Sequence, residues 1–345
     1  MVVLAILIVV LRVGTAFKFV SIGSDDWGRW SGHGPAWPDN ATRERFWEEG
    51  LWLSGGEASR ATAETSSDLD TLYALLDHIN EGMPRAHCAV LTPFWVVAGP
   101  DYDAMRQSGC PGEDTCAYRE LWWHNSTGGL DRAPFDRGDL RGRYVEGFHR
   151  GLWHPEYHGR SHFDTRAWTA YLKAGEEVTS AYFDHGLTYY HYGRRNATSG
   201  IYHSTHSEYR SDDLVHQRPL NQMVAWIAEG VAGFEAFWGY SATVTALPCH
   251  YGFDSLGPLF RAAGISHVEG ERSGRGLLSA LENMARVLFD PVFEPPGSWH
   301  TALSLAKEKI EAELEEADHV AIQASTPSSA LPLSEHVSHR PLSRH

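Results

Sequence analysis

The chain has 345 residues and a formal net charge of −15, so it can bury a large core, and its charge argues against nucleic acid as a partner. One domain the size of an α/β barrel fits this length. Aromatic residues make up 12% of the chain and include 13 tryptophans, which suit stacking on sugar rings as well as core packing. We expect most of them in the core.

The N-terminus has the pattern of a secretory signal. Residues 1–11 are nearly all apolar, and the small residues among 13–16 offer a cleavage site before Phe17. A run this short does not span a bilayer, so no stable membrane partner is expected, although an uncleaved anchor is the alternative. Acceptor triplets at Asn40, Asn125 and Asn196 fit a secretory route. We therefore expect a signal peptide over 1–16 and a secreted, extracellular glycoprotein.

A strand followed by two carboxylates opens the remaining chain. The run from Phe17 is apolar with β-branched and aromatic residues, which is typical of a buried strand, and it leads into Asp25 and Asp26. Because strand side chains alternate between faces, the two carboxylates cannot both point inward while the strand continues. If the backbone turns at the strand's end, both can line the mouth of a barrel or a sheet edge, where α/β folds keep their chemistry.

Helices and strands are expected along most of the chain that follows. Leucines and one isoleucine at helical spacing predict a helix over 68–79, ended by Gly82 and Pro84. Further helices are expected over 165–183, 220–237, 256–263, 277–284 and 302–314, and strands over 86–97, 242–247, 265–268, 286–289 and 319–324. Residues 135–150 are ambiguous, and 187–213 form a polar insertion. Strands that alternate with helices indicate a parallel sheet, closed or nearly closed.

The pattern indicates a single domain over 17–324 and a disordered tail, rich in Ser, Pro and His, over 325–345. Cys110 and Cys116 flank a short loop with Pro and Gly, and in a secreted chain they could close a small disulfide. Cys88 and Cys249 are expected to be buried thiols.

Two histidines stand four residues apart in the segment that begins at Trp153. This spacing places His158 and His162 on one face of a helical turn, which suits a shared metal. Two neutral imidazoles, one carboxylate and an open position make a catalytic set of the zinc type, and Asp25 or Asp26 could supply the carboxylate. In a chain with 20 histidines, the same spacing also arises by chance.

These motifs resemble those of the polysaccharide deacetylase-like family in the glycoside hydrolase/deacetylase barrel superfamily, as a divergent branch. Asp25-Asp26-Trp27-Gly28 is similar to the family's strand-end Asp-Asp-Gly with Trp27 inserted, and His158 to His162 matches its His-x-x-x-His signature. The segment from Phe237 to Pro248 resembles the one that leads into the family's Arg-Pro motif, but its Arg is absent.

The resemblance implies a distorted (β/α)7 barrel that binds a divalent metal, usually zinc, and removes acetyl groups from a glycan. Carried over by position, the metal ligands are Asp26, His158 and His162, and the catalytic base is Asp25. The family also has a late histidine that acts as general acid, and residues 321–327 contain none.

Other polar residues near the motifs are further candidates. If 153–158 is a strand, Glu156 shares a face with His154 and His158 and can act as an acid or base, although a surface carboxylate is an equal alternative. For substrate binding we select residues beside the motifs or at a strand end: Arg29, Arg160, Trp27, His250 and Tyr251. The cluster over 203–208 is expected to be an exposed insertion.

Three classes of function follow. The first is a metal-dependent carbohydrate deacetylase, which we favour. The second is a glycan-cleaving hydrolase or lyase on the same barrel, with Asp25, Asp26 or Glu156 as acid and base. The third is a glycan-binding protein without catalysis. In each case the partner is a polysaccharide or oligosaccharide.

Overall fold

The computed structural model describes residues 12–13, 16–17, 19–28, 64–85, 88–125, 138–184, 186, 188, 207–209, 218–248, 252, 254–271, 282–289 and 319–325. The predicted signal peptide, the triplets at Asn40 and Asn196, Cys249, the helix over 302–314 and the tail after Ser325 lie wholly or mostly outside these residues. None of the described helices is both long and apolar enough to cross a membrane.

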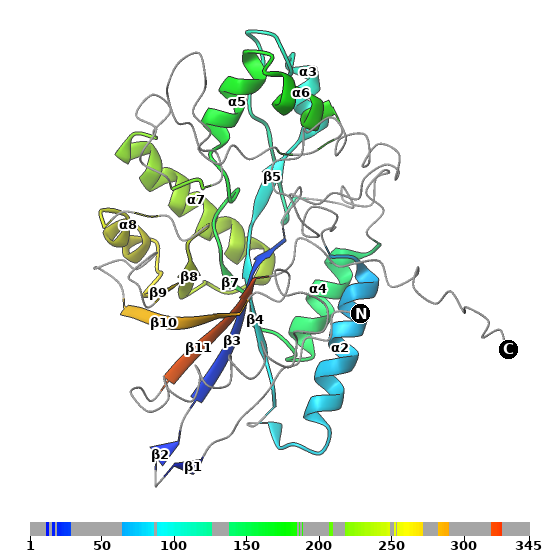
Figure 1. Ribbon diagram of the computed structural model, residues 1–345, viewed down its shortest axis with the longest axis vertical. Coiled ribbons are helices and arrows are strands. Elements are labelled where there is room, and N and C mark those ends of the chain that lie inside the picture. Colours follow the sequence, from blue (N-terminus) through cyan, green and yellow to red (C-terminus); the bar gives the residue numbers. More distant parts are fainter. Residues whose placement is uncertain are drawn as a thin grey trace, which may run out of the picture.

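Seven parallel strands form a curled sheet, and three of them, β3, β11 and β10, lie side by side in Figure 1. The strands are β3 (Phe19–Trp27), β4 (Leu91–Trp95), β7 (Glu156–Tyr157), β8 (Val244–Ala246), β9 (His267–Glu271), β10 (Glu282–Phe289) and β11 (His319–Ser325). Their order is β10-β11-β3-β4-β7-β8-β9, and the pairing of β9 with β10 closes the ring. The predicted α/β class is confirmed. A complete (β/α)7 repeat is not, since the described residues include no helix on either side of β10.

Helices lie beside the sheet and beyond one end of it. Those beside the sheet are α2 (Ser66–Asn80), α4 (Leu140–His149), α7 (Leu220–Trp238) and α8 (Leu256–Ala262). Beyond the carboxyl end of β4, Figure 1 shows an upper lobe with α3 (Tyr102–Gln107), α5 (Thr165–Lys173) and α6 (Glu177–Asp184). The hairpin of β5 (Ala98–Pro100) and β6 (Glu120–Trp122) leads into it, and β1 (Arg12–Val13) pairs with β2 (Ala16–Phe17) at the opposite end.

Helix α2 shows why the periodic pattern predicts correctly. Thr65 caps its N-terminus in a capping box with Asp68, which satisfies backbone donors that the helix leaves open. Leu69, Tyr73 and Leu76 are buried on one face. The helix ends just before Gly82, close to the expected boundary.

The main core surrounds Trp95 of β4. Its ring lies 4.4 Å from that of Tyr144 and 5.0 Å from that of Trp238, both edge to face, and 5.3 Å from that of Trp123. Such ring geometries each add about 0.5–1.5 kcal/mol to the free energy gained by burial. The expectation that most tryptophans serve the core holds for this cluster.

A second core lies in the upper lobe. Phe163, Trp168 and Phe183 pack there with Met105 and Leu172, next to the disulfide. Cys110 and Cys116 are bonded, which confirms the predicted pair.

Two predicted helices were wrong in part. Residues 282–284 belong to β10, where Met284 pairs with Glu269 of β9, because a short apolar run does not distinguish a strand from a helix. The helix expected over 165–183 is two helices, since Gly175 with φ 63° interrupts it. Cys88 is partly exposed rather than buried.

Candidate metal centre

The end of β3 carries a bulge at the two carboxylates, which differ in backbone conformation and exposure. The register of β3 against β4 shifts between Ser24 and Trp27, and Asp26 has a φ of 69°, in the left-handed region. Asp25 stays in the ladder opposite Ser325 of β11 and is buried, whereas the Asp26 side chain is 23% exposed. The bulge thus breaks the alternation that the sequence predicts and re-aims the second carboxylate.

Gly28 fixes the turn after the carboxylates. Its φ is 75°, and an added Cβ would lie 2.6 Å from Trp95 Cε2 and 2.7 Å from the Val96 carbonyl oxygen. The Trp123 indole N–H donates to the Gly28 carbonyl at 2.6 Å. Only glycine fits this position. The contacts with Trp95 and Trp123 hold the turn after Asp25 and Asp26 against the main core.

His158 and His162 lie on a loop after β7, which corrects the expectation of a helical turn. The described chain is not helical between Tyr157 and Thr165, where α5 begins. Gly159 has φ 106° and His162 has φ 69°, conformations that a right-handed helix excludes. The loop still brings the two imidazole rings to 5.2 Å between centroids.

Asp26 meets both histidines. Its Oδ1 lies 2.8 Å from His162 Nε2 and 3.4 Å from His158 Nε2. One ligand atom from each of these three residues can be chosen so that all lie within 4.8 Å of one another. The predicted Asp-His-His set therefore comes together in the structure.

The tautomer of His158 fits a cation at this place. Its Nδ1 lies 2.8 Å from the Ala246 carbonyl oxygen, which can only accept, so Nδ1 carries the proton of the neutral ring. Nε2 then presents a lone pair toward the Asp26 carboxylate, and it makes no hydrogen bond within the described chain. His158 Nε2 and Asp26 Oδ1 are thus two acceptor atoms that face each other, which suits a shared metal ion. A histidine ligand commonly donates its other ring N–H to a backbone carbonyl, as His158 does here.

Glu156 is buried and bonded to the sheet. Its carboxylate accepts from the backbone N–H groups of Thr243 (2.9 Å) and Val244 (3.0 Å). Burial raises the pKa of Glu156, and these hydrogen bonds act in the opposite direction. It holds β7 against the start of β8, so the alternative of a surface carboxylate is wrong, while an acid or base role stays a prediction.

The Arg160 side chain lies between two tryptophans and is paired with two carboxylates. Its guanidinium stands 4.6 Å from the Trp122 ring and 4.0 Å from the Trp226 ring. It donates to Glu120 at 2.6–3.1 Å and to Glu229 at 2.5 Å. Substrate binding by Arg160 stays a prediction, and it would compete with these contacts.

Of the other candidates for substrate binding, the structure describes only Trp27. Trp27 is buried in the main core, where its ring meets that of Trp153 at 5.4 Å. Arg29, His250 and Tyr251 lie outside the described residues.

Two buried carboxylates near the centre were not selected from the sequence. Glu208 accepts from the backbone N–H groups of Arg160 (2.7 Å) and Ser161 (3.1 Å), so the expectation of an exposed cluster is wrong here. Glu269 of β9 is buried, and its Oε2 lies 3.3 Å from where a Cβ on Gly23 would be. In the sequence, Glu269 directly follows the strand expected over 265–268, and that pattern could have identified it, although the structure places it within β9.

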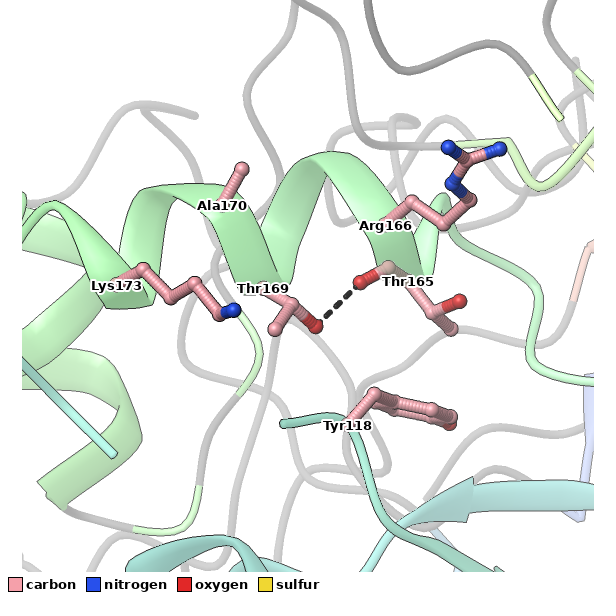
Figure 2. A pocket seen from close by; sticks show the side chains of 6 residues that line it. All are labelled: Tyr118, Thr165, Arg166, Thr169, Ala170 and Lys173. Atoms are coloured by element: carbon pink, nitrogen blue, oxygen red, sulfur yellow. Dashed lines mark hydrogen bonds between the residues drawn. The ribbon is translucent and has the colours of Figure 1, made fainter. Parts of the chain in front are cut away.

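Two pockets lie beside segments that carry the ligands. Figure 2 shows one of about 330 Å³ between Tyr118 and α5, where the Thr169 hydroxyl donates to the Thr165 carbonyl at 2.6 Å. Its lining is Tyr118, Thr165, Arg166, Thr169, Ala170 and Lys173. The other, of about 490 Å³, is lined by Trp122, His124, Arg160, Glu229, Ala232, Gly233 and Ala236. None of the three candidate ligands lines either pocket.

No protein-family profile matches the chain, and no curated protein matches it. Similar solved structures include a de-N-acetylase from Aggregatibacter actinomycetemcomitans, with 10% identity and a TM-score of 0.31 over 77% of this chain and 93% of that one. IcaB from Ammonifex degensii is 10% identical, with a TM-score of 0.29 over 85% and 98%. A 4-alpha-glucanotransferase from Thermococcus litoralis is 9% identical, with a TM-score of 0.36 over 89% and 33%. Similarities at this level assign neither a family nor an activity.

Proposed function

We propose that this chain is a secreted, metal-dependent enzyme that removes acetyl groups from a glycan, built on a distorted (β/α)7 barrel. The observation that carries the proposal is the Asp26-His158-His162 set, with both histidines buried, in which the Ala246 carbonyl orients one imidazole toward the carboxylate. The signal-like N-terminus supports secretion.

The donor set favours zinc, because two imidazole nitrogens and one carboxylate leave a fourth position open. Asp26, His158 and His162 would hold the metal, which would supply a Lewis acid for an acetyl carbonyl and lower the pKa of a bound water. The hydrogen bond from His158 Nδ1 to the Ala246 carbonyl keeps the His158 ring in the tautomer that can bind a metal through Nε2. The loop that carries His162 places the two imidazole rings 5.2 Å apart.

Asp25 is the base in this proposal. It directly precedes the ligand Asp26 and is buried, so its carboxylate can take the proton of the attacking water. The neighbouring strand β11 ends at Ser325, opposite Asp25, and supplies no histidine there. We therefore assign to Asp25 the return of the proton to the leaving nitrogen or oxygen as well.

Glycan cleavage by Glu156 is less well supported, because its carboxylate is bonded to the backbone of Thr243 and Val244. The test is to incubate the zinc-loaded full chain with a panel of acetylated polysaccharides and to analyse the products by mass. We expect released acetate and chains of unchanged length, with no release after chelation. Shortened or unsaturated chains without acetate would contradict the proposal.

A further inference from the structure

The loop over 158–162, called the histidine loop below, has two peptide groups at its centre. Both are hydrogen-bonded on two sides. On one side the Gly159 carbonyl accepts from the Val97 N–H at 3.2 Å, and the Arg160 carbonyl accepts from the Ala98 N–H at 2.8 Å. On the other side the N–H groups of Arg160 and Ser161 donate to the Glu208 carboxylate. Val97, the first residue of β5 and the Glu208 side chain thus bond the two peptide groups that lie between the two histidines.

Glu208 is bonded through both of its oxygens. Oε1 accepts from Arg160 N at 2.7 Å, and Oε2 accepts from Ser161 N at 3.1 Å, Ser161 Oγ at 3.1 Å and the Trp226 indole N–H at 2.7 Å. The side chain is 4% exposed. A buried carboxylate with several charge-assisted bonds is a rigid anchor.

The Glu208 carboxylate approaches the loop backbone closely at Gly159, whose φ is 106°. A Cβ on Gly159 would lie 2.0 Å from Glu208 Oε1, so only glycine lets the carboxylate reach the loop. The neighbours of Glu208 also fix its own segment, since the Tyr209 and Tyr157 hydroxyls lie 3.3 Å apart and both rings are buried.

We propose that Glu208 is a positioning residue for the metal centre: it holds the loop so that His158 and His162 reach Asp26 together. The proposal rests on the metal site of the proposed function. Without Glu208, two buried N–H groups lose their acceptor, and the loop must move to satisfy them. The separation of the histidines, and with it the affinity for the metal, then changes.

The test is zinc binding to the full chain, measured in competition with a chromogenic chelator. In Glu208→Gln one oxygen becomes an amide that cannot accept, so we expect about 10–100-fold weaker zinc binding, the usual effect of losing a support behind a metal ligand. Excess zinc should restore acetate release. Glu229→Gln is the matched control, because it removes an exposed partner of Arg160 and leaves the loop backbone untouched.

Hydrogen exchange on the wild-type chain gives a second measurement that does not depend on folding of the variant. The amides of Arg160 and Ser161 should exchange slowly, and rapid exchange would overturn the proposal. Equal zinc affinity of the folded Glu208→Gln and wild-type chains would also overturn it. If the wild-type chain binds no zinc, the proposed function fails as well, whereas equal affinities refute the positioning role alone.

Discussion

Asp26 and His162 meet at 2.8 Å, and both have a φ of 69°. Left-handed backbone at residues other than glycine costs of order 1–3 kcal/mol and is enriched at functional sites, although Asp and His adopt it more readily than most residues. From the sequence, Asp25 and Asp26 point to opposite faces if the strand continues, and both can line its end if the backbone turns. The bulge found there could not be predicted, since it depends on the register with β4. The cluster over 203–208 was expected to be an exposed insertion, and the burial of Glu208 appears only when distant segments meet.

Asp25 and Asp26 should respond differently to the same substitution. Asp26→Asn removes a ligand from a three-residue set, so the protein should lose bound metal and activity together. Asp25→Asn should keep the metal and lower turnover by about 10²–10⁴-fold, because only a proton acceptor is lost. Elemental analysis, thermal midpoint and acetate release on both variants test this. Full turnover in Asp25→Asn would contradict the assignment of Asp25 as the base. If both variants only lost stability and kept their activity per folded molecule, the two residues would be structural.

At the scale of elements, local patterns predict well where one periodicity dominates. Buried leucines and a capping box define α2, and the structure agrees within two residues at its start and one at its end. The patterns are misleading where tertiary contacts decide: residues 282–284 pair with β9, and the histidine spacing that suits a helical turn occurs on a loop. Spacing along the chain selected the three residues that come together in the structure, although the conformation expected for the histidines was wrong. Metal binding by these residues stays a prediction.

Arg160 links the loop over 158–162 to β6 through an ion pair with Glu120. The side chains of the two residues are only 11% and 10% exposed. Burial raises the pKa of Glu120, and the contact with Arg160 acts against that. Arg160→Met should therefore lower the free energy of unfolding by about 3–5 kcal/mol, because it leaves a buried carboxylate without its partner. The double variant with Glu120→Met should recover much of this loss in urea unfolding. A stable Arg160→Met chain with weaker glycan binding would instead support the predicted role in substrate binding.

At the scale of the whole molecule, each of the two cores includes a residue next to a candidate ligand. The main core around Trp95 includes Trp27, directly after Asp26, and the core of the upper lobe includes Phe163, directly after His162. The sequence predicts the parallel sheet and the disulfide, because alternating elements and paired cysteines are local signals. It does not predict the second core, since that core assembles from segments between β4 and β8 that carry no strand of the main sheet.

The disulfide should stabilise the upper lobe without supporting the metal site. Closing a loop with a sequence separation of 6 contributes about 2 kcal/mol in the chain-entropy account, so Cys110→Ser with Cys116→Ser should lower the free energy of unfolding by about that amount. Zinc affinity should stay unchanged, because the histidine loop is held by Val97, Ala98 and Glu208, none of which belongs to the upper core. Denaturant unfolding and zinc competition on the same preparation test both statements. Because Phe163 follows His162 directly, a loss of zinc affinity in the folded double variant would show that the upper core positions this ligand too.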